Sequence, residues 1–147
     1  MNAMHFVDTN LLVYARDASE SAKQPLAEAW LKHLWATRTG RLSTQVLGEY
    51  FVTVTNKLKP GLPPDEAWDD VERLLVWKPQ PLDVALLRKG RSLQARFGFS
   101  WWDALIVGAA HVSGCRFLLT EDLQDGQDLE GVTVVNPFLH PPDSPSR

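Results

Sequence analysis

Four acidic residues stand at places in the sequence where a metal-dependent reaction could be assembled: Asp8, Glu49, Asp103 and Asp122. Carboxylates that are brought together repel one another, and this repulsion raises their pKa values unless a cation lies between them. A cluster with only oxygen ligands selects a hard ion, so Mg²⁺ or Mn²⁺ is the expected cofactor. A bound ion of this kind acidifies a water molecule and stabilises the negative charge that develops on a substrate.

Each of these acids also has a purely structural interpretation. Asp8 could cap a helical turn that follows it, and Asp103 could form a capping box with the serine three residues before it. Glu49 lies about 60° outside the apolar arc of its predicted helix, as a solvated residue would. Asp122 lies in a polar loop, where acids are common in turns. The functional interpretation therefore depends on whether the four converge.

The predicted elements bring the four acids to one edge of a sheet. Short apolar runs alternate with longer helical patterns, which indicates βα units and an α/β fold around a mainly parallel sheet. Strands are predicted at 4–7, 41–45, 115–120 and 132–135, and helices at 22–38, 66–75, 84–97 and 101–113. Ligands of such sheets bind beyond the carboxyl ends of the strands. Asp8 and Asp122 follow two predicted strands, and Glu49 and Asp103 lie early in helices near this edge.

The segment 46–58 is ambiguous. Its apolar residues recur at helical spacing, which favours a helix. Its β-branched residues at 52–55 are also compatible with a strand.

The composition is that of one folded domain. The chain has 147 residues, of which 44% are hydrophobic and 22% charged, enough for a single core. We expect the domain to span residues 1–136 and the proline-rich tail 137–147 to be flexible. No apolar run reaches the roughly 18 residues that cross a bilayer, and the N-terminus lacks a signal-peptide pattern. A cytoplasmic location without a membrane partner is therefore expected.

The charge balance argues against a broad basic face of the kind that binds nucleic acid. The formal net charge is −3, and two divalent ions would add four positive charges and leave +1, so the loaded protein need not repel a phosphodiester. The single cysteine, Cys115, excludes both an internal disulfide and a thiolate metal cage. The four histidines are scattered and show no zinc-ligand spacing.

Four blocks of sequence together resemble the PIN-domain ribonucleases, and most closely the VapC-type toxins of type II toxin-antitoxin pairs. They are "VDTNLLVYA" with Asp8, "STQVLGEYF" with Glu49, "SWWDALIVGAA" with Asp103 and "LLTEDLQDG" with Asp122. The resemblance spans residues 6–136, in the family's order and spacing. It implies a three-layer α/β/α fold and Mg²⁺- or Mn²⁺-dependent endonuclease activity on RNA. It also implies a cognate antitoxin protein as a partner, and a homodimer.

The resemblance assigns roles to individual residues. Asp8 and Asp103 are the expected direct metal ligands, and Glu49 and Asp122 would either ligate or act through water. Asp125 is a further candidate ligand and Glu121 a weaker one. Three neighbouring polar side chains would hydrogen-bond and orient the carboxylates. They are Thr9, Asn10 and Thr120.

Contacts to the substrate must come from other residues. Basic side chains that could touch phosphates lie on one predicted helix and near the acids: Arg88, Lys89, Arg91 and Arg96, and Arg16, Lys57 and Lys59. A solvated helix face is the alternative explanation for such a run. Trp101 and Trp102 could stack on bases, although tryptophans at the start of a buried helix usually belong to the core.

Four other functions share parts of this pattern. A phospho-receiver module would need an acidic pair after the first strand and a lysine after a late one, and the sequence offers neither. A phosphatase with an aspartate nucleophile would need a second Asp where Asn10 stands. A PIN-like domain that only binds a partner, or a PIN ribonuclease that is not a toxin, remains an alternative.

Overall fold

Five short strands form one sheet at the centre of the computed structural model, which describes residues 2–142. The strands are β1 (His5–Val7), β2 (Gly40–Arg41), β3 (Phe117–Leu119), β4 (Asp128–Leu129) and β5 (Val132–Val135). Their order across the sheet is β2-β1-β3-β5-β4. All neighbours run parallel except β4 and β5. The predicted α/β class with a mainly parallel sheet is therefore confirmed.

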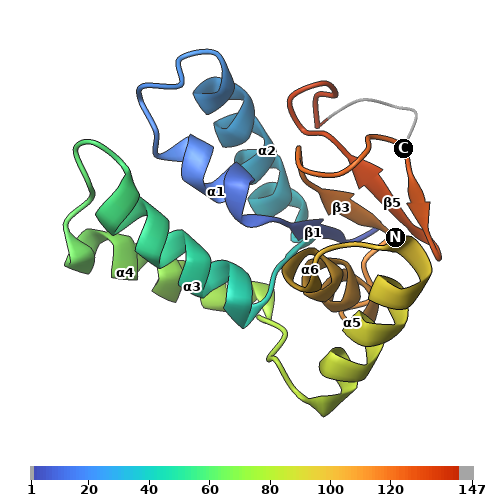
Figure 1. Cartoon of the computed structure of the whole chain (residues 1–147). Helices are drawn as coiled ribbons and strands as arrows, with labels where there is room; N and C mark the ends of the chain where they lie inside the picture. Colours follow the sequence, from blue (N-terminus) through green and yellow to red (C-terminus); the bar gives the residue numbers. More distant parts are fainter. Residues whose placement is uncertain (1, 143–147) are drawn as a thin grey trace.

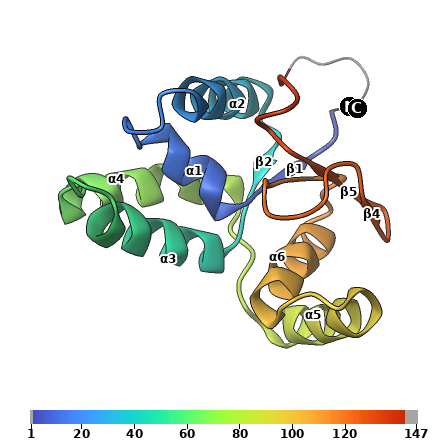
Figure 2. The same ribbon diagram turned by 45° about the horizontal axis from the view of Figure 1, so that its top comes forward.

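Helices cover both faces of this sheet. They are α1 (Thr9–Ala15), α2 (Lys23–Thr37), α3 (Thr44–Val52), α4 (Pro64–Leu74), α5 (Val84–Phe97) and α6 (Trp101–Val112). A π-helical segment, η1 (Thr53–Lys57), continues α3, and a 3-10 turn, η2 (Leu75–Trp77), continues α4. Figures 1 and 2 show α2 on one side of the sheet, α5 and α6 on the other, and α3 and α4 side by side at one end. The three-layer α/β/α arrangement is confirmed.

Most helix boundaries follow from local capping. Ser43 accepts a hydrogen bond from the backbone N–H of Val46 at 3.2 Å and so begins α3. Asp83 does the same for α5, and Gly98, with φ of 75°, ends that helix in the left-handed conformation that glycine tolerates. The strand alternative for 52–55 is wrong, because α3 extends to Val52 and η1 keeps the following residues helical.

Three predicted boundaries need correction. The strand predicted at 41–45 is only β2, because Ser43 already caps the following helix. Ser21 and Asp65 directly precede the helices predicted at 22–38 and 66–75 but do not cap them. Instead α2 begins at Lys23 and α4 at Pro64, both without a side-chain cap bond. Proline suits that position because the first turn needs no N–H donor there.

The core lies between the sheet and its helices. Trp30, Phe6, Leu105 and Leu118 are among the fully buried large side chains. The described part of the predicted tail lies against this core, since the Trp30 indole N–H donates to the carbonyl oxygens of Pro137 and His140 at 3.0 and 2.9 Å. Residues 143–147 lie outside the described part of the chain.

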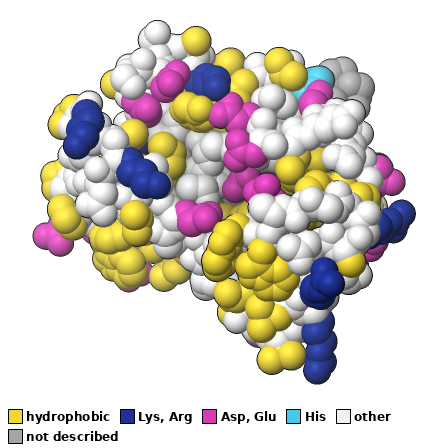
Figure 3. All heavy atoms as spheres, viewed as in Figure 1, with side chains coloured by type: hydrophobic (Ala, Val, Ile, Leu, Met, Phe, Trp, Pro, Cys, Tyr) yellow, Lys and Arg dark blue, Asp and Glu magenta, His cyan; other side chains and the backbone are white. Residues whose placement is uncertain are grey.

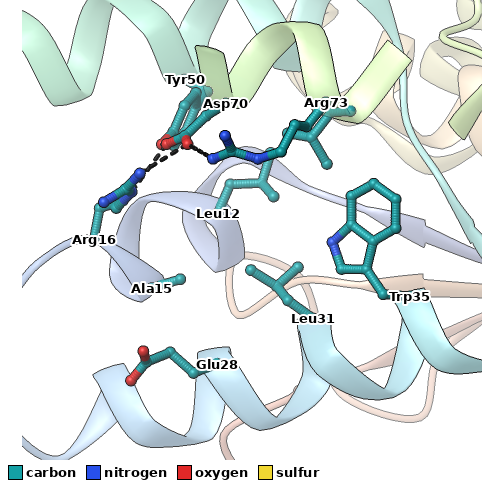
Figure 4. A pocket seen from close by; sticks show the side chains of 10 residues that line it. Leu12, Ala15, Arg16, Glu28, Leu31, Trp35, Tyr50, Asp70 and Arg73 are labelled. Atoms are coloured by element: carbon teal, nitrogen blue, oxygen red, sulfur yellow. Dashed lines mark hydrogen bonds and ion pairs between the residues drawn. The ribbon is translucent and has the colours of Figure 1, made fainter. Parts of the chain in front are cut away.

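A buried carboxylate ties three helices together at a cavity of about 370 Å³ (Figure 4). Asp70 on α4 accepts hydrogen bonds from Nε and Nη2 of Arg16, at the end of α1, at 2.9 and 2.7 Å. It also accepts the hydroxyl of Tyr50 from α3 at 2.5 Å, and the guanidinium of Arg73. Burial opposes ionisation, but the bonds from Arg16 and Tyr50 outweigh it and lower the pKa of Asp70.

None of the helices within residues 2–142 is both long enough and apolar enough to cross a membrane.

Candidate active site

A cleft of about 740 Å³ opens at the carboxyl ends of β1 and β3, where α1, α3, α6 and the loop after β3 meet. Six acidic residues line it: Asp8, Asp17, Glu20, Glu49, Asp103 and Asp122. Figure 3 shows acidic side chains along a hollow in the middle of this face, with hydrophobic side chains below it. Lys57 is the one Lys or Arg among the described residues that line the cleft. All four acids singled out in the sequence therefore reach one site.

The smaller cavity of Figure 4 cannot serve the same chemistry. The carboxylate buried in it, Asp70, is already neutralised by Arg16 and Arg73. A cation would have to displace these partners.

Asp8 lies at the floor of the cleft and is 9% exposed. It follows β1 and caps α1, because its Oδ1 accepts the backbone N–H of Thr9 at 2.7 Å. Its Oδ2 accepts the hydroxyl of Thr120, just after β3, at 2.8 Å. Burial raises the pKa of Asp8 to about 6 despite these two hydrogen bonds, and the nearby Asp122 and Glu49 add to the increase. Asp8 therefore both caps α1 and lines the cleft.

Thr120 and Asn10 link Asp8 to Asp122. The Thr120 oxygen accepts the backbone N–H of Asp122 at 3.1 Å and the Asn10 amide nitrogen at 3.3 Å. The same nitrogen donates to the Asp122 carboxylate at 3.1 Å. Because a carboxylate only accepts, this contact fixes which end of the amide is the nitrogen. The amide oxygen of Asn10 is buried and has no hydrogen-bond partner among residues 2–142.

Glu49 and Asp103 stand on the two helical walls. The hydroxyl of Thr9 donates to Glu49 Oε1 at 2.9 Å across the cleft from α1 to α3. Asp103 lies in the first turn of α6, where its backbone N–H donates to the Ser100 side chain at 3.2 Å. This places the half-buried Asp103 side chain at the cleft wall.

Two candidate acids lie elsewhere. Asp125 is absent from the cleft lining, and its carboxylate accepts the backbone N–H of Asn136 at 2.8 Å and contacts Nε2 of His140 at 2.7 Å. Glu121 accepts the hydroxyl of Tyr14 at 2.7 Å and pairs with Lys23 at 2.8 Å. Both carboxylates serve contacts that hold loops to the domain.

The predicted basic residues divide in a similar way. Only Lys57 reaches the cleft, because Arg16 is held by Asp70, and Lys89 and Arg96 pair with Glu130. Several residues of the lining carry no functional signal in the sequence, among them Val13, Gln45, Gly48, Val52 and Ile106. For Gly48 the only available signal was its place inside a predicted helix, where glycine has a low propensity.

The donor set suits a hard divalent ion that is shared with a substrate. Within the described residues, no three His, Cys, Asp or Glu side chains form a group that could hold a metal ion by themselves. Mg²⁺ usually keeps several waters and takes one or two carboxylates together with substrate phosphate oxygens. The carboxylates that line this cleft are of the type that could supply such ligands, and the hydrogen bonds from Thr9, Asn10 and Thr120 restrict the orientation of three of them.

Comparison with known proteins identifies a matching family and structures with a similar fold. The PIN domain family matches residues 5–124 of the chain. Among solved structures, the chain is similar to the crystal structure of Mycobacterium tuberculosis VapC20, described as a toxin that cleaves the sarcin-ricin loop. The two share 21% sequence identity and a TM-score of 0.61, over 80% of this chain and 91% of VapC20. No curated protein sequence matches the chain. At this identity the likeness to VapC20 is one of fold.

Proposed function

Since this chain belongs to the PIN domain family, we propose that it is a divalent-metal-dependent endoribonuclease that hydrolyses RNA phosphodiester bonds. The observation that carries the proposal is the convergence of Asp8, Glu49, Asp103 and Asp122 on one cleft beyond the strand ends. An acidic cleft of this kind repels a polyanion unless cations are bound in it. A metal cofactor, Mg²⁺ or Mn²⁺, is therefore part of the proposal.

Such an ion would act as a Lewis acid on the phosphate and lower the pKa of a bound water. In this chain Asp8 and Asp103 would hold it, from the floor and the α6 wall of the cleft. The Thr120 hydroxyl fixes the orientation of the Asp8 carboxylate through its 2.8 Å hydrogen bond. Glu49 and Asp122, positioned by Thr9 and Asn10, would ligate or hold a water molecule. No side chain is required as a covalent nucleophile.

We also propose that the chain is the toxin of a VapBC-type pair, acting on RNA in the cytoplasm. The sequence blocks around the four acids and the shared fold with VapC20 support this assignment. The expected partner is a small antitoxin that covers the acidic cleft and brings a basic side chain to it. A homodimer is expected by analogy with the family.

Cleavage of RNA is expected to require both a divalent ion and Asp103. Purified protein without antitoxin would be incubated with mixed RNA in Mg²⁺ or Mn²⁺, with and without EDTA, and the products resolved on a denaturing gel. EDTA and Asp103→Asn should each abolish cleavage. Asp69→Asn is the matched control because it removes an exposed acid of α4 outside the cleft. Intact RNA in every lane, from folded protein, would favour a PIN-like module that only binds a partner.

The Thr120 hydroxyl is expected to contribute to metal binding and activity by orienting Asp8. Thr120→Val removes the donor to Asp8 with little change in shape. Loss of a hydrogen bond that orients a metal ligand typically costs about 10- to 100-fold in metal affinity or activity. A titration of the cleavage rate against Mg²⁺ concentration would measure the shift. The control is Thr133→Val, the same change in the neighbouring strand β5, which should not alter the Mg²⁺ dependence of the cleavage rate. The same Mg²⁺ dependence in both variants would show that the Thr120 hydroxyl has no such role.

A further inference from the structure

The cleft has too few cations to hold RNA by ion pairs. Six acidic residues and one lysine, Lys57, line it. Bound metal ions can attract the phosphate at the reaction centre, but they leave the adjoining nucleotides without charged partners. The remaining attraction must come from surfaces that bind something other than phosphate.

Trp102 provides such a surface. It is 58% exposed and lines the cleft in the first turn of α6, beside Asp103. Its neighbour Trp101 is different, because it is partly buried and packs against the hydrophobic core, close to Gly90. A large exposed aromatic side chain in a concave site is a common sign of a binding surface. Core packing therefore accounts for a tryptophan at position 101 but not for the exposed one at position 102.

The α3 wall of the same cleft has an open apolar part beside Glu49. Val52 lines it and is 48% exposed. One turn earlier, Gly48 lies within the helix, and a Cβ added there would have no neighbour within 4 Å. A glycine inside a helix is less stable than an alanine at the same position. Because packing does not require it, its effect is to leave this wall of the cleft free of a side chain.

We infer that Trp102 stacks on an unpaired base next to the phosphate bound at the acids. The inference rests on the proposed nuclease function. The indole contributes a flat apolar surface without adding charge, and every base has a face that can stack on it. In a duplex these faces are already occupied by neighbouring base pairs, so a helical RNA cannot use Trp102 in the same way.

The test measures RNA binding in a background that does not cleave. In Asp103→Asn, with Mg²⁺, the Kd of a fluorescently labelled single-stranded RNA of about ten nucleotides is compared with that of a blunt duplex of the same sequence. Trp102→Ala should weaken single-strand binding by about 5- to 100-fold, the usual range for one stacked base. Trp102→Phe should recover most of the affinity. Trp68→Ala is the matched control, since Trp68 is 50% exposed on α4, outside the cleft.

Tryptophan fluorescence supplies a readout that a structural role would not change. Single-stranded RNA should quench part of the emission of the Asp103→Asn protein, and Trp102→Phe should lose that part while still binding. Unchanged affinity in Trp102→Ala, or an equal loss for duplex RNA, would overturn the stacking inference and leave the nuclease proposal standing. If the unsubstituted protein neither cleaves nor binds RNA, the proposed function fails and the inference fails with it.

Discussion

Replacing Asp8 by asparagine is expected to abolish cleavage and, at the same time, to stabilise the metal-free fold at neutral pH. The loss of activity follows from the position of Asp8 among the acids of the cleft, where it is proposed to hold the metal. A bound metal contributes several kcal/mol to transition-state stabilisation, so the rate should fall by about a thousandfold or more. Cleavage assays with Mg²⁺ would measure this, with Asp69→Asn as the charge-matched control.

The gain in stability follows from the raised pKa of Asp8. Because burial raises this pKa from 3.8 to about 6, the folded state holds the proton more tightly than the unfolded state. The favourable contribution of the protonated group is complete below about pH 4 and is lost as the pH rises through about 6. Above that pH the charged Asp8 costs the unsubstituted protein up to about 3 kcal/mol. Asp8→Asn should recover only part of this, because the Thr120 hydroxyl loses its acceptor.

Denaturant unfolding in EDTA between pH 4 and pH 8 would test this second effect. The stability of the unsubstituted protein should fall relative to Asp8→Asn between about pH 4 and pH 6 and then stay level. Mg²⁺ should reduce the difference by stabilising the charged carboxylate. Parallel stability curves for the two proteins would mean that the Asp8 carboxylate is already well solvated or paired in the metal-free fold.

Replacing Asp70 by alanine is expected to destabilise the domain by about 3 kcal/mol. Asp70 is 7% exposed and joins α1, α3 and α4 through Arg16, Tyr50 and Arg73. Removal of one partner from a buried ion pair costs about 3–5 kcal/mol because the other charge loses its compensation. The cost should lie at the lower end of this range because Arg16 is one-third exposed and can regain water. The midpoint of thermal unfolding should fall by about 10 °C.

The adjacent Asp69 is the matched control for this change. It lies on the same helix but is exposed, so Asp69→Ala should leave the midpoint nearly unchanged. Because the pKa of Asp70 is lowered in the fold, its contribution is complete above about pH 4 and is lost as the pH falls through the lowered pKa. The difference between Asp70→Ala and the unsubstituted protein should therefore shrink in acid. A difference that does not change with pH would assign the effect to packing alone.

The fold and the edge of the sheet that holds the acids were predictable because they depend on patterns with a definite period. Apolar runs and helical spacing gave the α/β class, and the rule for parallel sheets placed Asp8 and Asp122 at the carboxyl edge. The prediction for α5 was accurate because both of its ends carry strong local signals, Asp83 and Gly98. Residues with clear local chemistry were therefore placed well.

Residues whose position depends on tertiary contacts were harder to predict. Asp125 lies only three residues after Asp122, yet the bond to Asn136 and the contact with His140 hold it away from the cleft. Spacing along a loop does not contain that information. Arg16 similarly looked available for phosphate, but its partner Asp70 is far along the chain. Trp101 and Trp102 lie on different sides of α6, and their shared residue type does not indicate which of them is buried.

Helix α1 is anchored by different groups at its two ends. At its start Asp8 binds Thr120, and just after its end Arg16 binds Asp70. A helix of seven residues is not stable by itself in water, so its direction depends on these two anchors together with the packing of its buried Leu11 and Leu12. The helix is only about 10 Å long and is continuous between the two anchors. The position of the acid at the cleft floor is therefore mechanically linked to the cavity of Figure 4, and a ligand or substitution there would change the geometry of the acids without touching them.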